Sequence, residues 1–224
     1  MKNIKMWKEI YLEVDNNGYI INPKSDLING KIRLKIKGEY EEIKIGDNFL
    51  SWCCGLDEID FSGLRNITSI GSYFLFDCSG LEKLDLGGLQ NVITIGNNFL
   101  DGCMNLKKLN LSGLQNVTFF GSFFLSNCSG LKELDLNGLQ NVTTIGDRFL
   151  YDCKGVDELD LSGLQNVTSI GLYFLSWCNG LELIRCKGKI KEIIKDKYLN
   201  LYEKIEVEVE NVNIEINDSI KVEI

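Results

Sequence analysis

The stretch GLQNVTSIGLYFLSWC, residues 163–178, decides the fold because close variants of it recur along the chain. GLQNVTTIGDRFLYDC occupies residues 138–153 and GLQNVTFFGSFFLSNC occupies residues 113–128, so the interval is 25 residues. The pair Phe-Leu keeps this interval six times, and a cysteine follows each pair at a constant distance. The phenylalanines are Phe49, Phe74, Phe99, Phe124, Phe149 and Phe174. The cysteines are Cys53, Cys78, Cys103, Cys128, Cys153 and Cys178. Self-similarity at such a period indicates a solenoid in which each repeat forms one coil.

Each repeat contains the pattern L-x-x-L-x-L, for example LEKLDL at residues 81–86 and LKELDL at residues 131–136. The last two apolar positions alternate, so a short strand turns them to one side and its polar residues to the other. One such strand cannot bury its apolar face alone, whereas coils stacked about 4.8 Å apart bury it against each other. The sequence therefore predicts a β-rich α/β solenoid with a parallel β-sheet wall of stacked 25-residue repeats.

The second half of each repeat is expected to close the coil. V-T-S-I-G forms the opposite wall, and its glycine permits a tight corner that a side chain would block. F-L-x-x-C then makes a compact turn, with one turn of helix as an option, and points Phe and Cys inward. Asparagine amides at one corner are expected to bond the corner backbone, in preference to serving as N-x-[ST] glycosylation sites. These asparagines are Asn66, Asn91, Asn116, Asn141 and Asn166.

The repeat of this chain, C-x-x-L-x-x-L-x-L followed by V-T-S-I-G-x-x-F-L-x-x-C, resembles that of the BspA-like subclass of leucine-rich repeat proteins, whose pattern is close to V-T-S-I-G-x-x-A-F-x-x-C-x-x-L. The resemblance covers about residues 43–188. The repeat departs from the family in being two residues longer, in placing Leu after Phe, and in having Ser-Gly-Leu at a corner where the family has a proline. The resemblance implies the solenoid fold and a role in adhesion or recognition, as is typical of such proteins in bacteria and protists.

We expect one domain spanning residues 1–224, with caps that protect the two ends of the solenoid. Residues 1–42 are expected to form an N-terminal hairpin cap and a decayed repeat, because WKEIYLEV, DNNG and YIIN follow each other as strand, turn and strand. Residues 43–188 hold the regular repeats. Residues 189–224 are expected to form a C-terminal β cap, because apolar and acidic residues alternate in their second half, as in a protected edge strand.

Composition excludes several classes of function. The chain of 224 residues has a net charge of −8 and no histidine. An acidic protein is unsuited to binding nucleic acid, which requires a basic face. We find no signal peptide or membrane-spanning run, so the default expectation is a cytoplasmic protein without membrane insertion, and export by another route stays open.

The cysteine column is predicted to consist of free, buried packing residues, because cysteine is among the most buried residue types. Disulfides between neighbouring coils are the alternative, and they would need an oxidising compartment. The spacing fits no zinc site. Without histidine, neither cysteine nor serine has the usual base beside it. We therefore expect no metal, no cofactor and no enzymatic activity.

Three outward columns on the L-x-x-L-x-L wall are candidate binding residues. The third column places carboxylates next to each other, and like charges in this arrangement are destabilising. The column therefore serves solubility or local hydrogen bonds, or it recognises a partner with a basic surface. A calcium site is less favoured. The third column consists of Asp60, Asp85, Asn110, Asp135 and Asp160. A lysine cluster interrupts the acidic wall at Lys83, Lys107, Lys108 and Lys132. Along the other two columns we expect the ion pairs Glu58–Lys83, Glu82–Lys107, Lys108–Glu133 and Lys132–Asp157.

Aromatic side chains in otherwise polar columns are a second candidate surface, because such rings often mark contact sites. They are Phe119, Phe123, Tyr73 and Tyr173. Trp52 and Trp177 share another column near the two ends of the solenoid, and we expect them to pack against the caps.

Two functions fit these features. The first is a non-enzymatic module for protein–protein recognition that presents a charged solenoid wall. The second is a structural protein that assembles with itself. The sequence does not fix the partner or the oligomeric state.

Overall fold

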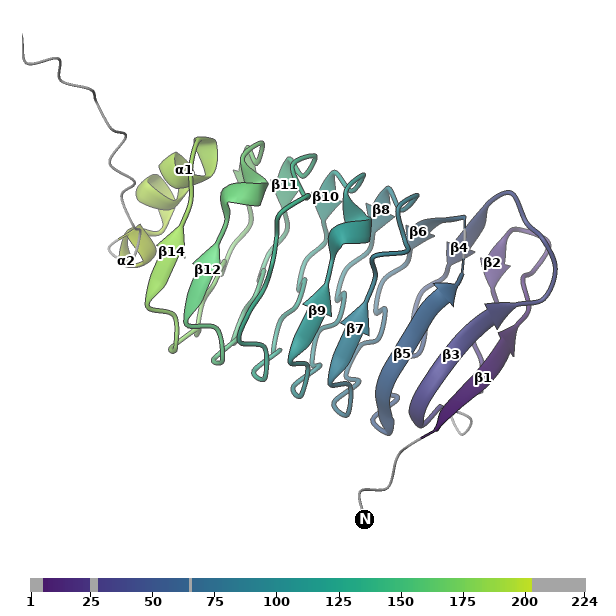
Figure 1. The fold of residues 1–224 in the computed structure, drawn as a ribbon. Coiled ribbons are helices and arrows are strands. Elements are labelled where there is room, and N and C mark those ends of the chain that lie inside the picture. Colours follow the sequence, from purple (N-terminus) through teal and green to yellow (C-terminus); the bar gives the residue numbers. More distant parts are fainter. Residues whose placement is uncertain (1–5, 25–27, 65, 203–224) are drawn as a thin grey trace, which may run out of the picture.

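The computed structural model describes residues 6–24, 28–64 and 66–202, and it shows a row of stacked coils (Figure 1). The front wall contains β1 (Trp7–Leu12), β3 (Gly30–Ile36), β5 (Leu56–Gly63), β7 (Lys83–Asp85), β9 (Lys108–Asn110), β12 (Glu158–Asp160) and β14 (Leu183–Arg185). The back wall contains β2 (Tyr19–Ile20), β4 (Ile43–Ile45), β6 (Ile67–Ile70), β8 (Thr94–Ile95), β10 (Phe119–Phe120), β11 (Thr144–Ile145) and β13 (Ser169–Ile170). Short 3-10 turns at Ser112–Leu114 and Ser162–Leu164 form two of the corners. The predicted solenoid is confirmed.

Every paired strand in both walls runs parallel to its neighbour, and the register repeats by one coil. In the front wall β1, β3, β5, β7 and β9 form one sheet, and β12 and β14 form a second. Leu84 lies opposite Leu109, and Ile59 lies opposite Leu84, so each inward side chain contacts its counterpart 25 residues away. Residues at the same position of successive coils therefore form rows along the solenoid.

The front wall is interrupted at residues 131–136, which keep the sequence pattern but are not part of either sheet. The main-chain N–H groups from Lys132 to Asp135 make no backbone hydrogen bond to a neighbouring coil. These residues still point Leu131 and Leu136 into the core. The interruption thus leaves these N–H groups without a backbone partner in the coil that carries β9.

The core is a continuous stack of phenylalanine rings, one from each coil. Ring centroids of Phe74 and Phe99 lie 5.2 Å apart, those of Phe99 and Phe124 lie 5.1 Å apart, and the ring planes in both pairs are nearly parallel. The six rings of the column are all buried. Stacked rings at this separation contribute about 0.5–1.5 kcal/mol per pair beyond the area that they bury.

The Phe-Leu corners are compact turns with Phe and Cys buried, as predicted, but their backbone is unusual and the optional turn of helix is not formed. Three residues of each corner adopt positive φ, for example Tyr73 (61°), Leu75 (53°) and Asp77 (52°). A left-handed residue other than glycine costs about 1–2 kcal/mol. Bonds between coils offset this cost, since Tyr73 N–H donates to Asn97 at 2.8 Å and Leu75 N–H donates to Phe49 at 2.9 Å. The corners are thus hydrogen-bonded from coil to coil along the lower edge of Figure 1.

Two other features that the sequence predicted hold neighbouring coils together, one at each end of the back wall. Asparagine amides bond the backbone of the preceding coil, with Asn116 donating to Gln90 at 2.8 Å and Asn141 donating to Gln115 at 2.9 Å. The glycine after the back wall is required by close approach, because a Cβ on Gly121 would lie 2.5 Å from the carbonyl oxygen of Gly96. Both predictions are confirmed at these positions.

The N-terminal cap is built differently from the predicted hairpin. β1 pairs in parallel with β3, and β2 pairs in parallel with β4, so the two strands belong to opposite walls. Only the bridge between Val14 and Ile20 joins them in antiparallel fashion. The hairpin was wrong because the turn at DNNG is the corner of a complete first coil, and each strand finds its partner in the next coil.

The C-terminal β cap is wrong for the residues that the structure describes there. Residues 189–202 form helices α1 (Lys189–Lys197) and α2 (Leu199–Tyr202). Ile190 and Ile194 of α1 are buried, and the ring of Tyr198 packs 5.6 Å from Phe174, which ends the phenylalanine stack. The remaining part of the predicted cap, residues 203–224, lies outside the described residues. The division of the chain into caps and one domain otherwise stays a prediction.

Candidate functional site

The cysteine column is structural, and its thiols form a second ladder between coils. All six side chains are buried and free. Each of the last five donates its S–H to the carbonyl of the corner leucine in the preceding coil; Cys128 reaches Leu100 at 3.2 Å and Cys153 reaches Leu125 at 3.0 Å. Burial raises the pKa of the Cys103 and Cys128 thiols above the ordinary range. Thiols that stay protonated and enclosed are packing residues, as predicted, and Cys54 is the exposed exception.

No group of three or more His, Cys, Asp or Glu side chains in the part of the chain that the structure describes is arranged to hold a metal ion. No helix among the described residues is long and apolar enough to cross a membrane.

The carboxylates of the third column accept hydrogen bonds from main-chain N–H groups two residues further along the chain. One carboxylate oxygen of Asp85 accepts from the N–H of Gly87 at 2.8 Å, and Asp135 and Asp160 accept in the same way from the residue two further on. Such turns are the usual reason for aspartate at a strand end. Asn110 also donates to Asp85 at 2.8 Å. The like charges of Asp60 and Asp85 are direct neighbours, as predicted, yet local bonding already gives each a structural role.

The lysine cluster is less neutralised than the sequence suggested. Lys107 pairs with Glu82 at 3.3 Å, as expected. The other three expected pairs are not formed, and no carboxylate among the described residues pairs with Lys83, Lys108 or Lys132. Lys83 and Lys108 are direct Cα partners on β7 and β9. Two unneutralised lysines side by side repel each other, and this arrangement attracts carboxylates from outside.

A shallow hollow of about 330 Å³ lies beside these lysines on the front wall. Glu58, Lys83 and Lys108 line it in one row, and Asp85 and Asn110 line it in the next. Its floor includes Leu109, which is partly exposed whereas its counterpart Leu84 is buried. The hollow thus brings positive charge, negative charge and a small apolar area together on neighbouring coils.

Ion pairs that the sequence analysis did not predict join the strands in the N-terminal part of the wall. Glu58 pairs with Lys31 at 2.7 Å instead of with Lys83, and Asp60 pairs with Arg33 at 2.6 Å. Burial alone would raise the pKa of Asp60, but hydrogen bonds from Ser62 and Arg33 lower it below the ordinary value. The missed signal was the decayed repeat, whose basic residues on β3 face the acidic residues on β5 through a shifted register.

The predicted aromatic residues divide into two places. Tyr73, Phe123 and Tyr173 occupy the same position of the Phe-Leu corner, while Phe119 lies on β10 in the back wall and is 43% exposed. Arg148 lies between two members of the first group, since its guanidinium is 4.8 Å from the Phe123 ring and 5.3 Å from the Tyr173 ring. Sequence reasoning missed Arg148, although it stands in the same column.

The two tryptophans do not pack against the caps as expected. Trp52 and Trp177 are each 63% exposed. Trp52 meets only one edge of Phe76, with ring centroids 5.0 Å apart, and Phe76 in turn contacts Tyr73 at 5.4 Å. Both tryptophans therefore extend the exposed aromatic surface of the corners.

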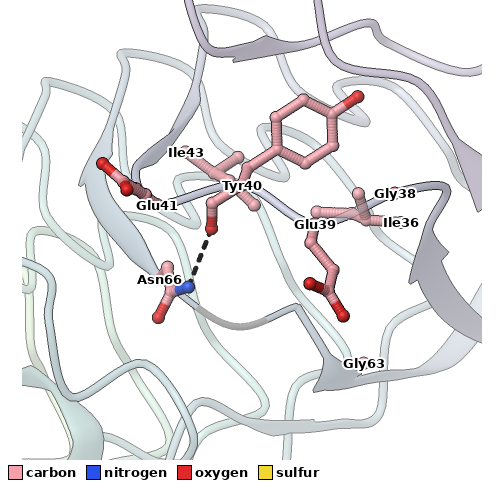
Figure 2. A pocket seen from close by; sticks show the side chains of 8 residues that line it. All are labelled: Ile36, Gly38, Glu39, Tyr40, Glu41, Ile43, Gly63 and Asn66. Carbon is pink, nitrogen blue, oxygen red and sulfur yellow. Dashed lines mark hydrogen bonds between the residues drawn. The ribbon is translucent and has the colours of Figure 1, made fainter.

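A second hollow, of about 570 Å³, opens where the decayed repeat meets the first regular one (Figure 2). Glu39 stands where later coils place a buried leucine such as Leu64. Asn66 donates to the carbonyl of Tyr40 at 2.9 Å across the hollow. The missing leucine explains this space, and its carboxylates make it acidic.

Comparison with known families decides the classification. The model of the BspA type leucine rich repeat region matches residues 43–182 and residues 114–220, with six copies. The chain belongs to the BspA-type leucine-rich repeat family. The resemblance noted from the repeat pattern is thereby confirmed. A search of curated proteins found no match.

Two solved structures resemble this BspA-type chain in fold. One is a leucine-rich repeat protein from Bacteroides ovatus, with 17% identity, a TM-score of 0.51, and coverage of 71% of this chain and 41% of that one. The other is a leucine rich cell surface protein from Faecalibacterium prausnitzii, with 18% identity, a TM-score of 0.49, and coverage of 80% and 53%. The chain spans about half or less of their length. At this identity the likeness shows the fold alone, and it rests on the first structure.

Proposed function

We propose that this BspA-type repeat chain is a non-enzymatic recognition module that binds a partner protein through its front wall. The observation that carries the proposal is the adjacency of Lys83 and Lys108 without a neutralising carboxylate. Between β3 and β5 the wall charges pair with each other, whereas these two lysines do not. Repeat proteins in general use such extended surfaces for binding.

The wall has a charge order of negative, positive and negative along the solenoid. Asp60 precedes the lysines along the solenoid, and Asp85 lies on the same strand as Lys83. Asp135 and Asp160 follow them. A partner with carboxylates opposite the lysines and basic residues opposite the aspartates would be fixed in register, and it would associate faster at low salt. This pattern favours a partner that is basic at its ends rather than basic throughout.

The interruption of the wall lies beside the same place. The main-chain N–H groups from Lys132 to Asp135 make no backbone hydrogen bond to a neighbouring coil, and this segment occupies the coil after Lys108 of β9. Main-chain groups without a partner can form hydrogen bonds with a bound protein.

The test is a charge reversal with a matched control. In the test variant Lys83→Glu and Lys108→Glu are combined. In the control variant Lys37→Glu and Lys154→Glu are combined, which gives the same net charge change away from the hollow. Partners enriched from the source organism by wild-type protein are purified and their affinity is measured at several salt concentrations. The proposal predicts at least about tenfold weaker binding for the test variant only. Equal binding of the two variants contradicts it.

Self-assembly is the second candidate, and one observation favours it. β1 is the last strand of its sheet, and no described strand pairs with its outer edge. An unprotected edge strand tends to pair with another chain. Sedimentation velocity across a wide concentration range tests this, because a protein that stays monomeric at high concentration does not assemble through this edge.

A further inference from the structure

The corner rings of Tyr73, Phe123 and Tyr173 form a row that the wall-based function does not use. We call these three residues the aromatic row. They occupy the same position in every second coil, and their φ values are 61°, 62° and 59°. Because the backbone has the same conformation at each site, the three side chains leave the corner in the same direction. Tyr73 is 40% exposed and Tyr173 is 53% exposed.

The spacing of the aromatic row follows from the stacking of the coils. Parallel strands lie about 4.8 Å apart, so rings in every second coil repeat at about 9.6 Å. The structure agrees, because the guanidinium of Arg148 lies 4.8 Å from Phe123 and 5.3 Å from Tyr173, which limits the separation of the two rings to about 10 Å.

This interval matches one turn of a polyproline II helix. That helix has three residues per turn and rises about 3.1 Å per residue, so it presents the same side chain direction every 9.3 Å or so. Over the two intervals from Tyr73 to Tyr173 the mismatch is about 0.6 Å. An α-helix returns the same face about every 10.5 Å, after seven residues, and drifts by about 1.8 Å over the same span. A β-strand repeats at about 6.7 Å and does not fit.

We propose that the aromatic row binds a proline-rich segment of another protein, held as a polyproline II helix along the solenoid axis with a proline at every third position. Prolines pack well on aromatic rings, and the helix loses little conformational entropy because it is already extended when free. The segment is not among these 224 residues, which contain one proline.

The surroundings of the row indicate which proline-rich segments it prefers. Asp77 and Asp152 lie four residues beyond the ring positions of their coils, and both are partly exposed. Asp147 adjoins Arg148 and is exposed. A lysine or arginine between the prolines is favoured beside Asp77, since Arg148 brings positive charge between Phe123 and Tyr173, and Lys154 already pairs with Asp152 at 3.0 Å. At the ends of the edge, Trp52 and Trp177 add exposed rings of the kind that dominate binding energy at protein interfaces.

The probe for the test is a twelve-residue peptide that repeats Pro-Arg-Pro. Its control keeps the length and the arginines but has alanine in place of every proline, so that it is not held as a polyproline II helix. Binding to the full chain is measured by titration calorimetry. The proposal predicts that the proline peptide binds at least about tenfold tighter than the alanine peptide.

Substitutions locate the binding to the row. Tyr73→Ala and Tyr173→Ala are each expected to weaken binding about tenfold, whereas Tyr73→Phe keeps the ring and changes affinity less than about twofold. Tyr11→Ala is the matched control, because Tyr11 is 54% exposed but lies on β1. Circular dichroism and thermal melting confirm that each variant is folded.

Three results would overturn the proposal. The first is equal binding of the two peptides, and the second is unchanged affinity after Tyr73→Ala and Tyr173→Ala. The third is binding of a β-linked glucan oligosaccharide to the row in place of the proline peptide. The variant with Lys83→Glu and Lys108→Glu separates the two proposals, since it should bind the proline peptide as wild type does.

Discussion

Substitution of Cys128 tests why a cysteine ends every repeat. Its thiol is fully buried and donates to the carbonyl of Leu100 at 3.2 Å. Cys128→Ala removes the sulfur and leaves a void of about one heavy atom, which costs roughly 1 kcal/mol. The lost donor adds about 0.5 kcal/mol or less, because the N–H of Cys103 still donates to the same carbonyl at 3.3 Å. We therefore expect a total loss of about 1–2 kcal/mol in the free energy of unfolding.

Cys128→Ser separates space filling from hydrogen bonding. The hydroxyl keeps a donor toward Leu100, so a thiol that acts as a donor predicts a smaller loss for Ser than for Ala. A thiol that acts only as an apolar group predicts the reverse order, because burying a hydroxyl is costly.

Urea denaturation under reducing conditions measures both variants, with the midpoint and the slope fitted together. Cys54→Ala is the matched control, because Cys54 is exposed and its loss should change stability by less than about 0.5 kcal/mol. A loss below that limit for Cys128→Ala, or a larger loss for Ser than for Ala, would refute the thiol ladder as a stabilising feature.

Three further predictions rest on single contacts. Of the eight cysteines, only Cys54 should react rapidly with a thiol reagent in the native protein, and all eight should react after denaturation; a total below eight would reveal disulfides. Gly121→Ala should destabilise by roughly 2 kcal/mol or more because its Cβ meets the Gly96 carbonyl, whereas Gly88→Ala, with open space around it, should be neutral within about 0.5 kcal/mol in the same denaturation assay. Asp60→Asn should lower the free energy of unfolding by about 1 kcal/mol at neutral pH, because the ion pair with Arg33 is lost. The pKa of Asp60 is lowered in the folded protein, so the difference between wild type and variant should be present above the ordinary carboxyl pKa and vanish as the pH falls through the lowered value. A difference that stays constant in thermal melts at acidic pH would contradict this.

The repeat made the rows predictable, because one constant interval fixes which side chains meet. Phe74, Phe99 and Phe124 stack as their spacing required. The corner conformation was not predictable in the same way. Leucine has no preference for positive φ, and Leu75 adopts it because bonds to the neighbouring coil and burial outweigh the local cost.

The secondary structure of the caps was predicted wrongly because the same local sequence pattern is compatible with two structures. Two strands joined by a turn can pair with each other or with the next coil, and β1 and β2 do the latter. In α1 the spacing of Ile190 and Ile194 was a helical signal, but the alternating pattern further along the chain was given more weight.

The candidate site was predictable as a set of columns but not as a set of contacts. The lysine cluster lies where the columns placed it, while its ion pairs depend on the decayed repeat. Lys31 takes Glu58 away from Lys83, and the register shift between β3 and β5 cannot be counted from the regular repeats. Arg148 could have been found by aligning its column, in which it stands between Phe123 and Tyr173.

The central claim is that equal positions in successive coils form straight rows, since both proposed binding surfaces are such rows. Ser62 and Lys187 share one row and are separated by five coils, which places their Cα atoms about 24 Å apart. Spin labels at Ser62→Cys and Lys187→Cys, in a chain that carries Cys54→Ser, allow this distance to be measured by pulsed dipolar spectroscopy. The account predicts a single narrow distribution centred at about 20–30 Å once the label linkers are included. A broad distribution, or one centred beyond about 40 Å, would contradict it.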